Sequence, residues 1–374
     1  MAEVQKRFAT LRSALAWSGL VALFFVTMEL AARLDDHLTF GAPLFGRYDM
    51  EQLFQPTPRG VRGVPNGSCM KWSLNSLGFR GAELQPFADQ VRVVTYGASE
   101  TFGIYEDVGR EYPRALERAL NAGDIVQRFE VINAGMPGMR VGSGVQLLRD
   151  IGANLHPDVV IVYPTPTHYI GVTRPYCERT VSARANSTPA FKARMGEKLK
   201  DRLKAALPRN GLTLMRKAGI WWDTRGEAVV DRVAPANLDA FDHDLRCALG
   251  AIREAGAVPV LVTHANRFGT VHHSDDEYWL TGWRGQYPEM RESGFVDLED
   301  RANERVRGIA RGENVILVDA AAALSGVPES FADHAHFTNE GADKLGRLLA
   351  NAVRETSALR PSAAADVRTT VLPQ

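Results

Sequence analysis

Three residues, Ser99, Asp333 and His336, have the types and the chain order that nucleophilic catalysis requires. Ser99 follows the apolar run 91–95, where a strand would turn into a helix. Asp333 and His336 are three residues apart, a spacing that places both side chains on one face of a helical turn. A serine hydroxyl needs a base that removes its proton, and a carboxylate orients that base. The order Ser, Asp, His predicts a serine hydrolase or an acyl transferase.

Each half of this set has a simpler explanation when it is taken alone. A serine after a strand is often only a helix N-cap. The Asp333–His336 segment could be a surface loop with incidental histidines, although residues 337–341 lead straight into a helical pattern. His334 is the neighbour of Asp333 and would point elsewhere, so we expect His336 to be the base.

The fold must join these distant segments, and the hydrophobic pattern indicates how. Five short runs rich in Val and Ile alternate with helical patterns; the runs are 91–95, 129–132, 159–163, 258–263 and 315–319. Continuous apolar runs of this length are typical of strands buried on both faces of a parallel sheet. The helical patterns are 112–120, 145–154, 238–255, 298–310 and 338–354, the last with Thr338 as its N-cap. This alternation predicts an α/β three-layer sandwich with a five-stranded parallel sheet. Ligands bind beyond the carboxyl ends of such strands, where Ser99 would lie.

The remaining segments divide the chain into parts. Residues 1–35 are predicted to be a signal anchor, 36–85 an irregular lead-in rich in Pro and Gly, 86–357 the catalytic domain, and 358–374 a disordered tail. Residues 170–235 are too long for one crossover and read as a helical insertion, basic between 192 and 217. A solvated helical face explains that insertion. A lid, or a contact with anionic lipid or polysaccharide, is the alternative.

The N-terminus carries the signal for a membrane. Residues 13–32 are almost uncharged, interrupted by Glu29, and approach the ~20 residues that cross a bilayer core. Lys6, Arg7 and Arg12 precede the span and favour a cytoplasmic N-terminus. We favour an uncleaved anchor over a cleaved signal peptide, because no clear cleavage site follows. Either way, the remaining chain is expected on the exported side.

Composition excludes some classes of function. Among 374 residues, 44 Lys and Arg balance 44 Asp and Glu, which argues against nucleic-acid binding. Cys69, Cys177 and Cys247 are widely spaced and form no zinc motif; the number allows one disulfide, and three free or buried thiols are the simpler interpretation. The run 272–277, rich in His and acidic residues, consists of neighbours in a loop that rarely converge on a metal. We therefore expect neither a metal nor a cofactor, and the oligomeric state stays open.

Together, the motifs resemble the SGNH/GDSL hydrolase family. The resemblance covers about residues 75–355 and rests on segments 95–103, 131–138 and 333–338. Segment 75–81 is similar to the lead-ins of membrane-anchored members from polysaccharide-modifying systems. The resemblance implies a flavodoxin-like fold, with Ser99 as nucleophile, His336 as base and Asp333 as its partner. It also implies an oxyanion hole formed by the backbone N–H groups of Ser99 and Gly138.

Two positions depart from the family pattern. Ala98 replaces the usual Asp before the nucleophile, a position that is not catalytic. More seriously, residues 163–168 lack the Asn that serves as third oxyanion donor. Thr165 or Thr167 could donate instead, or a donor such as Asn75 or Asn133 could come from elsewhere. Losing one such donor typically costs a factor of about 10² to 10³ in rate.

The sequence thus predicts an esterase that cleaves O-acyl esters through an acyl-serine intermediate. Its expected substrate is an acylated carbohydrate, with acetyl as the favoured group, and the carbohydrate preference follows from the resemblance and the anchor. Two alternatives stay open: a polysaccharide O-acyltransferase with the same triad, and a non-catalytic carbohydrate-binding or assembly protein.

Overall fold

The computed structural model describes residues 2–42, 44–45, 50–85, 90–123, 127–179, 193–226, 228–269 and 273–358. At its centre lies a parallel sheet with the strand order β6-β5-β7-β8-β9. In chain order the strands are β5 (Gln90–Gly97), β6 (Arg128–Asn133), β7 (Val159–Tyr163), β8 (Val258–Val262) and β9 (Ile316–Val318). Each strand coincides with one of the five apolar runs, which confirms the predicted parallel sheet.

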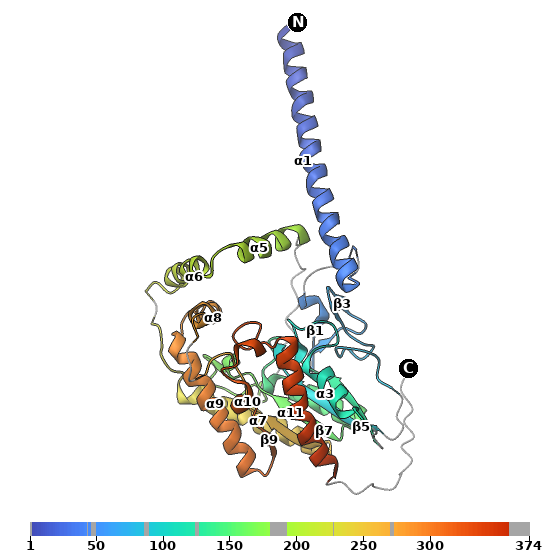
Figure 1. Cartoon of the computed structure of the whole chain (residues 1–374), viewed down its shortest axis with the longest axis vertical. Helices are drawn as coiled ribbons and strands as arrows, with labels where there is room; N and C mark the ends of the chain where they lie inside the picture. The colour runs from blue at the N-terminus through green and yellow to red at the C-terminus, as the bar shows by residue number, and fades with distance from the viewer. Residues whose placement is uncertain are drawn as a thin grey trace.

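Helices cover both faces of this sheet, so the predicted three-layer sandwich is confirmed (Figure 1). One face packs against α3 (Tyr112–Leu120) and α11 (Asn339–Ala358). The other face packs against α4 (Val145–Leu155), α7 (Pro235–Glu254) and α9 (Glu292–Gly312). Neighbouring strand residues face opposite layers, as Val93 and Val94 do, and both are fully buried. Burial on both faces is the reason that the strands read as unbroken apolar runs.

The strand order reverses beside β5, and this point positions the candidate site. The chain passes from β5 to β6 on one side and then returns to β7, β8 and β9 on the other. A crevice forms outside the carboxyl ends of the two strands that flank such a reversal. Ser99 begins the short helix α2 (Ser99–Phe102) directly after β5, so it lies at the carboxyl end of the strand where the order reverses.

The lead-in is more regular than the sequence predicted. It contains η1 (Met50–Leu53) and two small antiparallel hairpins, formed by β1 (Phe54–Thr57) with β2 (Gly60–Gly63) and by β3 (Ser68–Cys69) with β4 (Trp72–Ser73). The abundant Pro and Gly keep these strands short without abolishing them. The lead-in has its own small core, in which Leu53 and Trp72 pack with Phe102 of α2. It therefore supports the helix that begins with Ser99.

Two parts lie outside the sandwich. Helix α1 (Ala2–Phe40) is longer than the predicted span 13–32. Its part from Arg12 to Phe40 is long and apolar enough to cross a membrane. The insertion at 170–235 holds α5 (Arg194–Ala206) and α6 (Arg209–Asp223), which run crosswise to α1 (Figure 1).

The remaining short elements connect the layers. Helices α8 (Asp276–Arg284) and α10 (Ala320–Leu324) were not anticipated from the sequence. The Thr338 hydroxyl accepts a hydrogen bond from Gly341 N at 3.1 Å, so the predicted N-cap of α11 is confirmed. The predicted disordered tail lies outside the described residues beyond Ala358.

Candidate active site

The turn after β5 is built to present Ser99. A Cβ at Gly97 would lie 2.2 Å from Thr101 Oγ1 and 2.6 Å from the carbonyl oxygen of Tyr163. Only glycine therefore lets the chain pass this closely between β7 and α2. A similar constraint holds Gly135 in the loop after β6, where a Cβ would lie 2.4 Å from Phe102 N. These two close approaches bring the loops after β5 and β6 together around Ser99.

Asp333 and His336 lie in the loop between η4 (Pro328–Ser330) and α11. The sequence predicted a helical turn for them, and this prediction was wrong in its local structure. Asp333 Oδ1 instead accepts hydrogen bonds from the backbone N–H groups of Ala335 and His336, at 3.0 and 2.9 Å. Such an Asx turn brings residues three apart together without a helix. The side chains of Asp333 and His336 therefore still meet.

The structure brings the three predicted residues into one hydrogen-bonded chain. His336 Nδ1 donates to Asp333 Oδ2 at 2.8 Å, and His336 Nε2 accepts from Ser99 Oγ at 2.8 Å. Burial would lower the pKa of His336, but its hydrogen bond and ion pair with Asp333 outweigh burial and raise it. Burial would likewise raise the pKa of Asp333, yet His336 and His334 hold it well below its ordinary value. Asp333 is thus ionised and fixes the tautomer in which Nε2 can accept a proton.

Two aromatic contacts distinguish the histidines. The ring of His334 stacks on Trp283 at 4.7 Å, and burial lowers its pKa to about 4. His334 is therefore a neutral packing group at neutral pH. The ring of Tyr105 meets the ring of His336 edge-on at 5.4 Å, and burial together with the Asp333 charge raises the pKa of Tyr105. Tyr105 was not singled out from the sequence, where it lies in an unremarkable loop after Gly103.

A second buried chain of charged groups lies behind Ser99 and was also missed. Glu100 Oε2 lies 3.4 Å from Ser99 Oγ, and Glu100 Oε1 lies 3.4 Å from His264 Nε2. His264 Nδ1 in turn lies 2.7 Å from Glu299 Oε2. All three charged side chains are buried. The one signal for this chain in the sequence was Glu100, a carboxylate that follows the nucleophile directly at a position that the fold must bury.

The charges in this second chain compensate each other. Burial opposes protonation of His264, but Glu299 and Glu100 outweigh it and raise the pKa to about 10. Burial would raise the pKa of Glu100, but the His264 hydrogen bond and the charge of His336 lower it below the ordinary value. Burial raises the pKa of Glu299. An imidazolium thus lies between two buried carboxyl groups, and Glu100 is ionised beside Ser99.

The oxyanion donors proposed for the third strand end do not fit that role. The Thr165 hydroxyl donates to Glu100 Oε2 at 3.0 Å, so its single proton is committed. The Thr167 side chain is buried. Of the reserve donors, Asn75 Nδ2 donates to Ala82 O at 3.1 Å and Asn133 Nδ2 donates to Phe102 O at 3.4 Å, which uses one of the two N–H groups of each amide.

Gly138 remains the predicted partner of the Ser99 N–H. It lies in the loop that follows β6, with φ at +75°, a conformation that favours glycine. A Cβ at Gly138 would meet nothing within 4 Å. This backbone segment therefore borders open space, as a donor to a substrate must.

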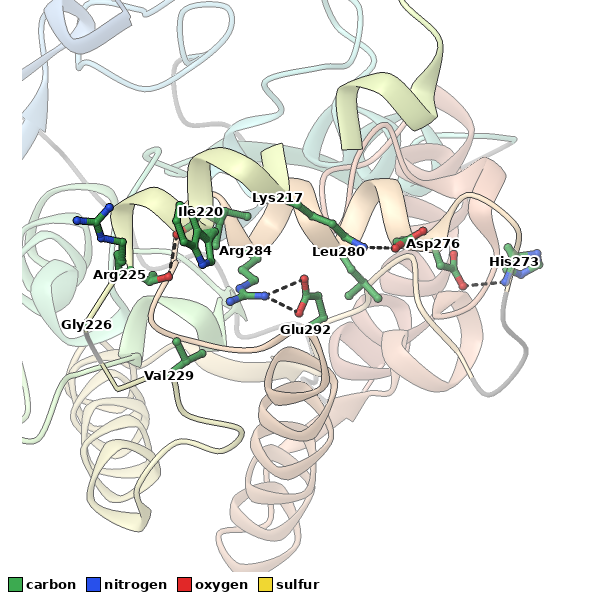
Figure 2. Close-up of a pocket in the computed structure, with 13 residues that line it drawn as sticks. Lys217, Ile220, Arg225, Gly226, Val229, His273, Asp276, Leu280, Arg284 and Glu292 are labelled. Atoms are coloured by element: carbon green, nitrogen blue, oxygen red, sulfur yellow. Dashed lines mark hydrogen bonds and ion pairs between the residues drawn. The ribbon is translucent and has the colours of Figure 1, made fainter. Parts of the chain in front are cut away.

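The cavity between α6 and α8 is separate from this site (Figure 2). It encloses about 880 Å³ and is lined by residues of α6 and of the segment that follows it, by His273 and residues of α8, and by Glu292. Ion pairs join its walls, with Lys217 bound to Glu277 and Arg284 Nη1 lying 3.1 Å from Glu292 Oε2. The three triad residues are not among those that line it.

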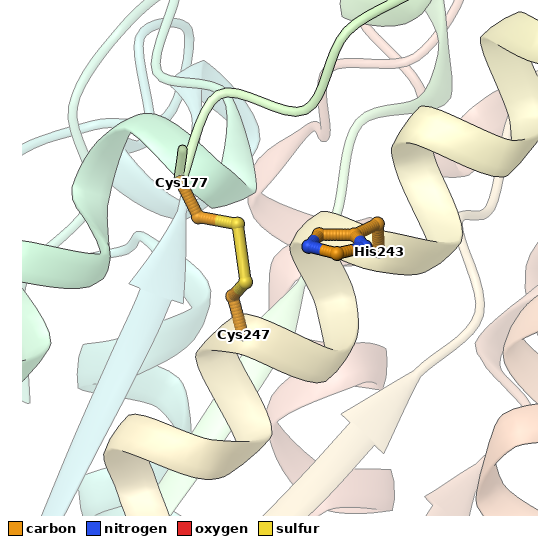
Figure 3. A group of neighbouring side chains, drawn as sticks. All are labelled: Cys177, His243 and Cys247. Carbon is orange, nitrogen blue, oxygen red and sulfur yellow. A yellow bond between two sulfur atoms is a disulfide. The ribbon is translucent and has the colours of Figure 1, made fainter. Parts of the chain in front are cut away.

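The metal prediction concerned the run 272–277. His272 lies outside the described residues, and the backbone N–H of His273 donates to Asp276 Oδ2 at 2.8 Å. Elsewhere, the ligand atoms of Cys177, His243 and Cys247 lie within 4.8 Å of one another (Figure 3). The two cysteines form a disulfide, however, so they offer no thiolates. The donor set therefore does not suit a metal that needs thiolate ligands.

Comparison with known proteins gives structural matches only. No family model and no curated protein matches the chain. Similar solved structures include a lipase/acylhydrolase from Enterococcus faecalis, with 17% identity over 74% of this chain and 100% of that one, at a TM-score of 0.42. A GDSL-like lipase from Bacteroides thetaiotaomicron matches at 14% identity, 73% and 92% coverage and a TM-score of 0.40. An acetylxylan esterase from Geobacillus stearothermophilus matches at 14% identity, 72% and 95% coverage and a TM-score of 0.38.

Proposed function

We propose that this protein is a membrane-anchored, exported serine esterase that hydrolyses O-acyl esters, with O-acetyl groups on carbohydrate as its substrates. The observation that carries the proposal is the continuous chain from Ser99 Oγ through His336 to Asp333, with 2.8 Å at both of its hydrogen bonds. A nucleophile, a base and an orienting carboxylate in contact are the parts that acyl transfer needs.

The geometry gives each group a step. Ser99 Oγ attacks the ester carbonyl carbon while His336 Nε2 takes the hydroxyl proton. Nε2 then returns that proton to the departing alcohol oxygen as the ester C–O bond breaks, leaving an acyl-Ser99. Water repeats the sequence, giving its proton to Nε2, and releases the carboxylic acid and the Ser99 hydroxyl. Asp333 stays ionised and stabilises the imidazolium at both steps.

The negative oxygen that forms during attack needs donors. We assign this role to the backbone N–H groups of Ser99 and Gly138. Thr165 has no part in this assignment, because its hydroxyl donates to Glu100. A hole with two donors is weaker than one with three, so the catalytic rate is expected to be modest.

The proposed location rests on two features. Arg194 and Lys198 of α5 form ion pairs with Asp36 near the end of α1. Because α1 thus packs against another part of the folded chain, these ion pairs favour an anchor that is retained over one that is cleaved. The disulfide between Cys177 and Cys247 is typical of proteins outside the reducing cytosol (Figure 3). The carbohydrate preference is supported by segment 75–81, whose resemblance points to polysaccharide-modifying systems.

The deciding experiment is labelling with a fluorophosphonate probe, which reacts only with an activated serine. We expect the wild-type protein to be labelled and Ser99→Ala to be unlabelled at an unchanged melting temperature. Absence of labelling in the folded wild-type protein would contradict the proposal and favour the non-catalytic binding protein.

A second assay separates hydrolysis from transfer. Release of acetate from acetylated oligosaccharides is measured with and without an unacetylated acceptor glycan. Hydrolysis predicts acetate release that does not depend on the acceptor. Acceptor-dependent consumption of the ester, with the acetyl group recovered on the acceptor, would instead identify the O-acyltransferase.

A further inference from the structure

Helices α5 and α6 stand away from the sandwich and have few contacts with it. The start of α5 is held by α1, where Arg194 pairs with Asp36. Helix α6 rests on α8 through one edge, as Arg216 donates to the Tyr278 carbonyl oxygen at 2.9 Å. Figure 1 shows both helices crosswise to α1, on the side of the domain from which α1 extends. Their outer faces are thus left open.

These outer faces are apolar. On α6, Thr213 and Ile220 are buried on the edge toward the domain. Helical spacing places Met215 and Trp222 on the opposite side, where they are 66% and 68% exposed. The apolar side chains that α5, α6 and their connection expose are Leu199, Leu203, Leu207, Leu214, Met215, Trp222 and Trp221, the last of which also lines the cavity between α6 and α8. Exposed apolar side chains gathered in this number mark an interaction site.

The position of α5 along α1 indicates what this face meets. The backbone N–H groups of Arg194 and Met195 donate to the Glu29 carboxylate, at 3.0 and 2.8 Å. Glu29 is the first charged residue after the uncharged stretch 13–28. Helix α5 therefore begins at the level where the apolar part of α1 ends, and it continues crosswise from there.

We propose that α5 and α6 lie in the interface of the bilayer that α1 crosses, with their exposed apolar side chains inserted among the lipids. The inference rests on the membrane anchor of the proposed function. The pair has the composition of in-plane helices, with an apolar face flanked by basic residues that attract anionic headgroups. These basic residues include Lys200, Lys204 and Arg225. Trp221 and Trp222 are of the residue type enriched at membrane interfaces.

Helical spacing places Asp201 on the edge of α5 opposite Leu199, so the two edges of this helix differ in polarity.

The test uses nitroxide labels on single introduced cysteines of the full chain in vesicles of phosphatidylcholine and phosphatidylglycerol. Native thiols do not interfere, since Cys69 is buried and the other two cysteines form the disulfide. Collisions of each label with oxygen, which concentrates in lipid, are compared with collisions with a water-soluble nickel chelate. Circular dichroism of every variant, compared with the wild type, verifies that it is folded.

We expect Leu203→Cys and Met215→Cys to give oxygen-to-chelate ratios several-fold above that of Asn351→Cys, an exposed site on α11. Asp201→Cys, on the opposite edge of α5, is the matched control and should give a low ratio. Phe25→Cys reports on α1 itself. Low ratios at Leu203 and Met215 with a high ratio at Phe25 would overturn the inference while leaving the anchor intact.

Two other outcomes would also overturn the inference. A low ratio at Phe25 would show that the anchor has failed, and the interfacial helices with it. Spin–spin broadening between Leu203 labels, together with low ratios, would show that a second copy of the chain covers this face. Fluorophosphonate labelling is independent of both outcomes, so it separates them from failure of the esterase proposal.

Discussion

Glu100 Oε2 lies 3.4 Å from Ser99 Oγ, so a buried carboxylate stands directly beside the proposed nucleophile. At 2.8 Å, His336 is the closer acceptor for the hydroxyl proton. Thr165 and His264 also hold the Glu100 carboxylate. Its negative charge also acts on His336, whose imidazolium form it stabilises in addition to Asp333.

Replacement of Glu100 by Gln tests this effect. The base must be unprotonated, so kcat/KM rises with pH through the pKa of His336, which lies above its ordinary value of 6.5. Removing one negative charge lowers that pKa, and the acidic limb of the pH–rate profile moves to lower pH. The measurement is the pH dependence of kcat/KM on an aryl acetate.

The same profile for Glu304→Gln, an exposed position on α9, provides the control and should match the wild type. The charges of Asp333 and Glu106 also raise the pKa of His336. In both variants the acidic limb is therefore expected to stay at higher pH than for a free histidine. If the acidic limb of the kcat/KM profile of Glu100→Gln coincided with that of the wild type, Glu100 would have no electrostatic effect on the base.

Asp333→Asn is expected to lower kcat/KM by about 10⁴, the cost of losing the orienting carboxylate in a comparable triad. The amide cannot stabilise the imidazolium, so the pKa of His336 falls as well. Rate measurements across pH should show both a lower plateau and an acidic limb displaced to lower pH. A plateau within ten-fold of the wild type would exclude Asp333 as the partner of the base.

The buried His264 predicts a pH dependence of stability. Its pKa is raised from 6.5 to about 10 in the folded protein, so folding favours the protonated form. The resulting stabilisation is fully present below pH 6.5 and is lost as pH rises toward 10. The melting temperature should therefore fall across this interval.

His264→Gln separates this contribution from other titrations. We expect the variant to melt at lower temperature than the wild type at pH 6.5, with a gap that narrows as pH approaches 10. Differential scanning calorimetry at several pH values provides the comparison. If the difference in melting temperature between the variant and the wild type did not change with pH, His264 would not be protonated in the folded state.

The sequence predicted the sheet well because burial on both faces leaves its mark on every strand residue. Val93 and Val94 face opposite layers and are both apolar, so the run was visible without the fold. Contacts between side chains distant in the chain leave no such local mark. Glu100 and Glu299 are far apart in the sequence, and only the fold shows that His264 lies between them and contacts both.

The catalytic spacing was predicted for a reason that differs from the observed one. Asp333 and His336 meet because Oδ1 of Asp333 binds two backbone N–H groups in an Asx turn. A helical turn and an Asx turn both bring residues three apart together, so the sequence cannot tell them apart. The failure of Thr165 as an oxyanion donor follows likewise from Glu100, a partner that local sequence does not reveal.

The disulfide provides a prediction on stability. Cys177 and Cys247 are separated by 70 residues, and closing a loop of that length in the unfolded chain stabilises the native state by about 4 kcal/mol in the chain-entropy account. Replacing both cysteines by Ser should lower the free energy of unfolding by up to about that amount. Urea denaturation of the double variant measures it, and equal midpoints for variant and wild type would contradict the expectation.

Gly138 and Gly171 form a matched pair for testing the oxyanion hole. Their φ angles are +75° and +71°, and a Cβ at either would meet nothing within 4 Å. An alanine at either position should therefore cost a similar ~1–2 kcal/mol of backbone strain. Only Gly138→Ala should shift a backbone donor that the reaction uses, with a loss of kcat of up to about 10². Steady-state kinetics and urea denaturation of both variants decide the assignment, and equal activities at equal destabilisation would remove Gly138 from the oxyanion hole.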